Sequence, residues 1–122
     1  MATIEITKDN FEEVVQRNPF VVIDFWADWC APCRRFAPIF EQASEKHTDV
    51  VFGKVDTEAQ PELTAAFDIR SIPTLMVIRE GAIIFEQPGA LPAPMLEQVI
   101  EDARAIDAEE IRAAVANHQH SS

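Results

Sequence analysis

The segment FVVIDFWADWCAPC, residues 20–33, leads from a buried strand into a helix through a pair of cysteines. Residues 20–26 are a continuous apolar, β-branched and aromatic run interrupted by Asp24, which is typical of a central strand covered on both faces. After the cysteines, an apolar stripe at helical spacing predicts a helix to about Lys46, with Pro38 as a kink. The stripe consists of Phe36, Ile39, Phe40 and Ala43.

Shorter elements are predicted on both sides of this segment. Residues 3–6 alternate with period two, as in a strand. Asp9 followed by Glu12 has the spacing of a capped helix start, and Asn18-Pro19 ends that helix. Further apolar runs predict strands over residues 50–55, 74–78 and 82–85.

The second half of the chain combines two helices with a strand pair. Thr57 is expected to cap a short helix that carries Leu63, and Pro94 lies in the first turn of a longer helix. Glu80-Gly81 is the turn between the last two strands, which are therefore antiparallel neighbours. The order βαβαβαββα predicts an α/β fold of three layers, α/β/α, around a central mixed five-stranded sheet.

Length and composition fit one folded domain with an appended segment. The chain has 122 residues, of which 48% are hydrophobic. A chain of this length and composition can form a hydrophobic core that needs no metal or disulfide to stabilise it. We assign residues 1–106 to the domain and residues 107–122 to a C-terminal extension. Asp107 and Glu110 have capping-box spacing there, so a short helix followed by a frayed end is expected.

Charge and hydropathy exclude several classes of partner. The formal net charge is -11, which argues against nucleic acid and against an anionic membrane surface. The longest apolar stretch, residues 20–27, is too short to span a bilayer. Because the first ten residues lack the pattern of a signal peptide, we expect a cytoplasmic protein, and we expect a monomer.

The two cysteines form one Cys-x-x-Cys motif at a predicted helix start. Unpaired N–H groups and the positive end of the helix dipole lower the pKa of a thiol at that position, which makes Cys30 a nucleophile. Cys33 lies one turn later, close enough to form a disulfide with Cys30. The same spacing occurs in zinc sites, but these need two further ligands. A pair of inert core cysteines is the other alternative.

The residues around this motif resemble the thioredoxin family over about residues 2–106. The resemblance rests on Phe25-Trp26-Ala27-Asp28-Trp29-Cys30-Ala31-Pro32-Cys33, on Asp24, on Lys54, and on Ser71-Ile72-Pro73-Thr74. It implies the thioredoxin fold and a protein-disulfide reductase that cycles between dithiol and disulfide. It also implies that no cofactor is bound, because a flavin-dependent thioredoxin reductase supplies electrons from NADPH.

The resemblance also implies roles for two charged residues. A carboxylate in a strand covered on both faces should have a raised pKa, which suits a proton acceptor. In the family the residue that matches Asp24 accepts the proton of the resolving cysteine, here Cys33. Lys54 matches a lysine beside that aspartate. The alternatives are a tolerated buried acid for Asp24 and a surface charge at the sheet edge for Lys54.

Protein substrates are expected in a flat apolar groove beside the cysteines. The resemblance implies that Pro73 is a cis proline facing them and that the backbone of Ile72 pairs with an extended substrate segment. Trp29 and the loop containing Gly89 match the other walls of the groove, next to the active-site residues Ala31 and Pro32. For Trp26, plain core packing is the preferred interpretation.

Several positions depart from the family pattern. Ala31 stands where glycine is most common, and Arg34 keeps the positive charge of the usual lysine. Asp68 and Ser71 stand where many relatives have glycine, which suggests a stiffer loop before Pro73. Because no histidine separates the cysteines, the expected reduction potential is nearer the value of about -270 mV typical of thioredoxin than the value of about -120 mV typical of DsbA.

Two other functions stay open at this point. The chain could be a docking subunit that uses its acidic C-terminal region to recruit a basic partner, in which case activity would survive loss of both cysteines. It could instead be an oxidase or isomerase of an oxidising compartment, which would have a higher reduction potential.

Overall fold

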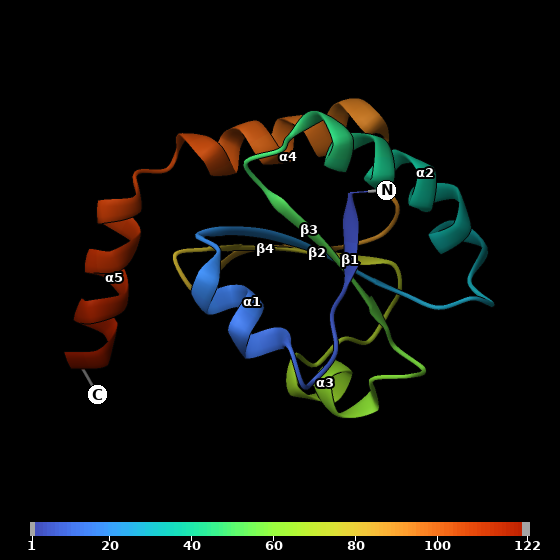
Figure 1. Ribbon diagram of the computed structural model, residues 1–122, viewed down its shortest axis with the longest axis horizontal. Coiled ribbons are helices and arrows are strands. Elements are labelled where there is room, and N and C mark those ends of the chain that lie inside the picture. Colours follow the sequence, from blue (N-terminus) through green and yellow to red (C-terminus); the bar gives the residue numbers. More distant parts are fainter. Residues whose placement is uncertain (1, 121–122) are drawn as a thin grey trace.

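The computed structural model describes residues 2–120 of the chain, with side chains up to Asn117 (Figure 1). The strands are β1 (Thr3–Glu5), β2 (Phe20–Trp26), β3 (Val51–Asp56), β4 (Thr74–Arg79) and β5 (Ala82–Pro88). The helices are α1 (Phe11–Arg17), α2 (Ala31–Lys46), α3 (Pro61–Ala66), α4 (Ala93–Ala105) and α5 (Ala108–His120). Their order confirms the predicted βαβαβαββα sequence and adds α5 after it.

The strands form one mixed sheet with β2 at its centre. The spatial order is β1-β3-β2-β4-β5, in which β1 and β2 run parallel to β3. β4 runs antiparallel to both β2 and β5. This confirms the predicted five-stranded sheet, and the apolar run of residues 20–26 takes the central position because both of its faces are covered.

Alternate residues of β2 point into two separate cores. Val22 and its neighbours on that face pack against α2 and α4, together with Phe36, Phe40 and Leu96. Val21, Ile23 and Phe25 pack on the opposite face, against α1 and α3. Figure 1 shows α2 and α4 on one side of the sheet and α1 and α3 on the other. The predicted three layers are therefore confirmed.

The β4–β5 connection is a two-residue turn, as predicted. Arg79 pairs with Ala82, which leaves Glu80 and Gly81 as the loop. Both loop residues have positive φ, 52° and 79°, the signature of a type I′ turn that matches the twist of the strands. β5 continues beyond the predicted end at residue 85 to Pro88.

The helix caps predicted at Asp9 and at Thr57 were both wrong. The hydroxyl of Thr7 accepts from the N–H of Asn10, and the side-chain oxygen of Asn10 accepts from the N–H of Thr7. This reciprocal pair, rather than Asp9 and Glu12, begins the α1 region. Thr57 lies too early to cap α3, which begins after Gln60; its hydroxyl donates instead to the carbonyl of Trp26.

The C-terminal extension forms α5, as the capping pattern predicted. The carboxylate of Asp107 accepts from the N–H of Glu109 at the start of this helix. Ile111 is buried, and Arg112 forms an ion pair with Glu80 at 2.6 Å, so α5 is attached beside the β4–β5 turn. The expected frayed end at residues 121–122 lies outside the described residues. No helix within residues 2–120 is both long and apolar enough to cross a membrane.

Candidate active site

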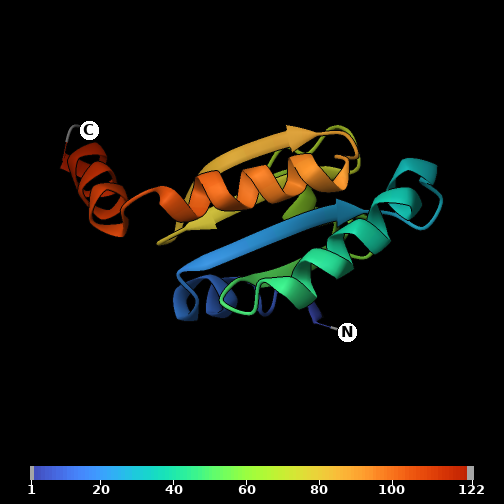
Figure 2. The same ribbon diagram turned by 90° about the horizontal axis from the view of Figure 1, so that it is seen from above.

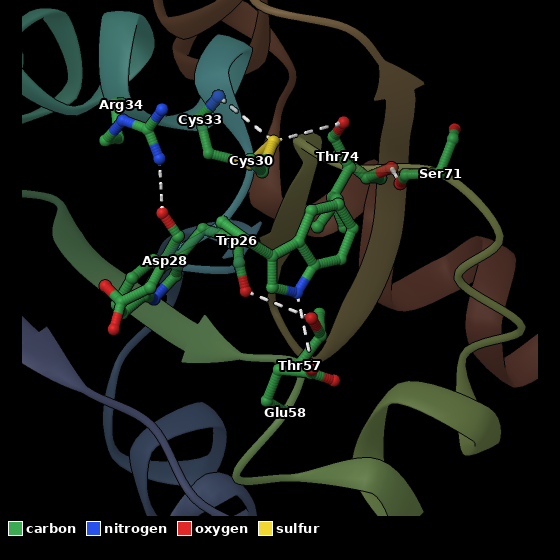
Figure 3. The surroundings of a disulfide bond; sticks show 11 residues. Trp26, Asp28, Cys30, Cys33, Arg34, Thr57, Glu58, Ser71 and Thr74 are labelled. Atoms are coloured by element: carbon green, nitrogen blue, oxygen red, sulfur yellow. Dashed lines mark hydrogen bonds between the residues drawn. A yellow bond between two sulfur atoms is a disulfide. The ribbon is translucent and has the colours of Figure 1, made fainter.

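The cysteine pair lies where the central strand passes into α2. A short loop follows β2, and Cys30 is the N-cap of α2 with extended backbone angles, φ -89° and ψ 110°. Pro32 falls in the first helical turn, where its missing N–H removes no helix hydrogen bond. Cys30 and Cys33 are joined by a disulfide, with their Cα atoms 5.2 Å apart (Figure 3).

The helix start provides a hydrogen bond to one of the two sulfurs. The N–H of Cys33 donates to Sγ of Cys30 at 3.2 Å, so the side chain of Cys30 caps its own helix. In the reduced protein the same N–H and the helix dipole favour the thiolate of Cys30. Both cysteines are almost fully buried in a small apolar cluster that includes Ala27. The helix start therefore stabilises the sulfur of Cys30 directly, through a hydrogen bond that the structure gives to that sulfur.

Asp24 is a fully buried carboxylate on the same face of β2 as α2. Asp24 lies two residues after Val22, so its side chain points to the same face of the strand, and Val22 packs against α2. Neither carboxylate oxygen of Asp24 has a hydrogen-bond partner among the described residues. Burial raises the pKa of Asp24 to about 7, and the nearby charge of Lys54 opposes part of that rise. A carboxyl group with this pKa can gain or lose a proton near neutral pH.

Lys54 is directly opposite Asp24 in the pairing of β2 with β3. Its ammonium group lies over the Trp26 ring, 4.9 Å from the centroid, within the range of a cation–π contact. Since β3 lies between β1 and β2, Lys54 is not on an edge strand, and the interpretation of it as a sheet-edge charge was wrong. Trp26 is half-buried and packs against the cysteine cluster.

The loop before β4 brings Ile72 and Pro73 to the disulfide. The peptide bond between them is cis, as the family resemblance implied. The carbonyl oxygen of Ile72 lies 3.7 Å from Sγ of Cys30, and the carbonyl of Pro73 accepts from the N–H of Gly89 at 2.7 Å. The loop that carries Cys30, the Ile72-Pro73 segment and the residue after β5, Gly89, therefore lie side by side. Asp68, earlier in this loop, has φ 55°, a conformation that glycine adopts more readily.

The surface around the disulfide is open on the side of Trp29. Trp29 is 67% exposed, and Ala31 and Gly89 are also exposed. The indole N–H of Trp29 donates to the carboxylate of Glu58 at 3.2 Å. Glu58 was missed by the sequence analysis, because an isolated acid in a turn after β3 carries no pattern. On the other side, the guanidinium of Arg34 donates to the carbonyl of Asp28 and so ties the loop between β2 and α2 to the helix.

A zinc site would require ligands besides the two cysteines. Within the described part of the chain, His, Cys, Asp and Glu side chains form no group of three that could hold a metal ion.

A comparison with protein-family models identifies the relatives of this chain. The Thioredoxin model matches residues 2–102, which is most of the sequence. The chain belongs to the thioredoxin family. With its Cys30–Cys33 pair it is a thiol-disulfide oxidoreductase, and its activity is the reduction of protein disulfides.

Individual thioredoxins support this assignment. The protein named "Putative thioredoxin 2" of Streptomyces coelicolor is 58% identical over 118 residues, 97% of this chain and 88% of its own length. That match runs into α5, beyond the point where the family model ends. A thioredoxin of Alicyclobacillus acidocaldarius is 39% identical over 102 residues, 83% of this chain and 97% of its own length.

Solved thioredoxin structures have the same fold. A Plasmodium falciparum thioredoxin superposes with a TM-score of 0.76 at 36% identity, covering 82% of this chain and 97% of its own. Thioredoxin f from spinach chloroplast gives a TM-score of 0.78 at 31% identity, covering 85% and 96%.

Proposed function

We propose that this thioredoxin reduces disulfides of cytoplasmic proteins through Cys30 and Cys33 and is itself reduced by a flavin-dependent thioredoxin reductase that draws on NADPH. The observation that carries the proposal is the hydrogen bond from the N–H of Cys33 to Sγ of Cys30 at a helix start. A reductase of this kind fits a compartment in which thiols are kept reduced, which supports the cytoplasmic assignment. No bound cofactor is needed, because each step is a thiol–disulfide exchange.

The reaction begins with attack by the Cys30 thiolate on one sulfur of a substrate disulfide. One substrate cysteine leaves as a thiolate, and the other stays bound to Cys30 as a mixed disulfide. Cys33 then loses its proton and attacks Sγ of Cys30, which releases the second substrate thiolate. The substrate has gained two electrons, and the Cys30–Cys33 disulfide has formed. The reductase returns two electrons to restore the dithiol.

Asp24 is proposed as the base that takes the proton of Cys33. Its burial on the face toward α2 and its pKa of about 7 support this role, since a base works best with a pKa near the working pH. Lys54, opposite Asp24 in the sheet, is proposed to stabilise the charged carboxylate.

Substrates are proposed to bind across the exposed surface beside Cys30. Ile72, with its carbonyl 3.7 Å from Sγ of Cys30, is suited to pair with an extended substrate backbone. Pro73 and Gly89, joined by a hydrogen bond, form one wall. Trp29 forms the other wall, beside Ala31 and Pro32, and its exposed ring offers apolar contact to varied sequences.

The order of attack can be tested with single cysteine variants. Reduced wild type, Cys30→Ser and Cys33→Ser are each mixed with insulin, and the products are separated under non-reducing conditions and weighed by mass spectrometry. Cys33→Ser should accumulate a covalent adduct with an insulin chain, because the resolving thiol is missing. Cys30→Ser should form little adduct, and both variants should fail to turn over. Equal trapping by both variants would refute the assignment of Cys30 as the nucleophile.

A further inference from the structure

An apolar cleft of about 510 Å³ separates α5 from the start of β5. Its apolar lining consists mainly of Ile83 and Ile84 of β5, Ile106 before α5, and Ile111, Ala114 and Val115 of α5. Ile111 is buried and holds the helix against the domain, and Ile84 is half-buried against the core. Ile83, Ile106 and Val115 are exposed. Among the α5 residues whose side chains are described, Ile111 is buried and Arg112 pairs with Glu80, so the attachment of this helix lies near its start and leaves the cleft beside it.

Large apolar side chains are exposed in this cleft to an unusual degree. Ile83 is 48% exposed, Ile106 38% and Val115 36%. They are three of the six large apolar side chains that are exposed among the described residues. Single exposed apolar residues are ordinary, but a contiguous group lining a cleft is typical of an interaction site.

The apolar lining continues along β5 and is bordered by acidic residues. A second cavity of about 110 Å³ between β5 and α4 shares Ile84 and Ile106 with the first. Glu110 lines the first cavity and Asp102 the second. Neither carboxylate belongs to any of the ion pairs found within residues 2–117. Asp102 accepts a hydrogen bond from the uncharged side-chain amide of Gln98 at 2.8 Å, so the charge of both carboxylates is left without a cationic partner in these ion pairs.

The cleft is remote from the disulfide. β5 begins beside the cleft at Ala82 and ends at Pro88, next to Gly89, whose N–H bonds to Pro73. Figures 1 and 2 both show α5 at the end of the sheet opposite the loop between β2 and α2. A ligand in the cleft would leave Cys30 free to react.

We propose that this cleft docks a basic amphipathic segment of a partner protein, with its apolar side chains on the isoleucines and its lysines or arginines at Glu110 and Asp102. A second copy of this chain fits poorly, because each copy carries a net charge of -11 and the two acidic borders would repel. The docking surface adds a second, redox-independent contact to a protein whose family activity resides at the other end of the sheet.

The test uses two model peptides with the same leucine pattern on a helical face, one with lysine and one with glutamate on the polar face. Each is titrated into the isotopically labelled, oxidised full-length protein and followed by amide chemical shifts. The lysine peptide should shift residues 82–84, 106 and 110–115. The glutamate peptide should bind at least about tenfold more weakly, because its charges face Glu110 and Asp102.

Variants separate the apolar contribution from the charge contribution. Ile83→Asp should weaken binding of the lysine peptide by about tenfold, and Glu110→Gln combined with Asp102→Asn by about fivefold. Ile4→Asp, an exposed apolar residue on β1, and Asp9→Asn combined with Glu45→Gln are the matched controls and should bind as wild type does. Insulin reduction should be unchanged in all four variants, so failure of docking is distinguishable from failure of the redox function.

The proposal would be overturned by absence of binding, by shifts confined to residues 29–33 and 72–73, or by equal binding of both peptides. Sedimentation that shows a dimer built through the cleft would also overturn it, because the occupant would then be a second copy.

Discussion

Asp24 is the residue at which stability conflicts with the role that we propose for it as a base. Its carboxyl group lies fully buried without a hydrogen-bond partner among the described residues, an arrangement that disfavours the charged form. Its placement was predictable because a single acid interrupts an otherwise apolar strand. The contact between Trp29 and Glu58 was not, since it depends on how two loops meet.

The raised pKa of Asp24 predicts that the protein becomes less stable as pH rises. Below the ordinary value of 3.8 the folded and unfolded states both hold the proton, whereas between 3.8 and about 7 only the folded state does. The free energy of unfolding should therefore fall through this window, by a total of about 4 kcal/mol at most. Denaturant titrations of the wild-type protein at about pH 5 and about pH 8 measure this fall in the free energy of unfolding.

Asp24→Asn should abolish most of that pH dependence and be more stable than wild type near about pH 8, because the amide stays neutral in both states. It should also slow release of reduced insulin by about tenfold or more, since the proposed base is lost. Asp9→Asn, at an exposed carboxylate, is the matched control and should keep the wild-type pH profile. An Asp24→Asn profile parallel to that of wild type would show that Asp24 titrates normally.

At the scale of elements, periodicity predicted the strands and helices well, whereas capping patterns predicted the start of α5 but not the starts of α1 and α3. The apolar run of β2 and the Glu80-Gly81 turn have strong local causes, and both were found as expected. The cap of α1 depends on which of several polar side chains reaches a free N–H, and Thr7 with Asn10 does so instead of Asp9 with Glu12. Spacing alone does not distinguish these pairs.

Gly53 of β3 allows the side chain of Ile6, which follows β1, to pack closely against the β3 backbone. A Cβ atom at position 53 would overlap the buried side chain of Ile6. Gly53→Ala should therefore destabilise the protein by about 1–3 kcal/mol, the range for overpacking. Ile6→Val, which removes Cδ1, the atom with the greater overlap, should cost about 1 kcal/mol alone.

The double variant tests this contact directly. Gly53→Ala with Ile6→Val should be less destabilised than the sum of the single variants, because removal of Cδ1 relieves the larger of the two overlaps with the new methyl group. Urea unfolding of the four proteins gives the coupling free energy. Strict additivity would mean that Gly53 is needed for a reason other than space beside Ile6.

For the whole molecule, the sequence predicted a domain and an added helix but not how the two meet. Both large cores are built from residues that end at Ala103, and Ile111 is the buried residue of α5 among those described. The position of α5 depends on the burial of Ile111 and on the ion pair of Arg112 with Glu80. These are long-range contacts, which the periodicity of a sequence does not predict. The cleft and its acidic border follow from that position.

A chain ending at Ile106 should fold and reduce insulin at about the wild-type rate. Loss of α5 removes the burial of Ile111, which corresponds to about 1–3 kcal/mol. Circular dichroism during urea unfolding and the insulin assay check the two parts of this prediction. Failure of the shortened chain to fold would show that the domain extends through residue 107 and beyond.

The reduction potential of the Cys30/Cys33 pair tests the reductase assignment most directly. The full-length protein is equilibrated in glutathione buffers of graded ratio, quenched with acid, and its dithiol and disulfide forms are quantified by mass. We predict a reduction potential of about -270 mV, because the dithiol must be able to reduce protein disulfides in a reducing compartment. A reduction potential of about -120 mV would mean that the protein oxidises its substrates. It would contradict both the proposed direction of the reaction and the proposed cytoplasmic location.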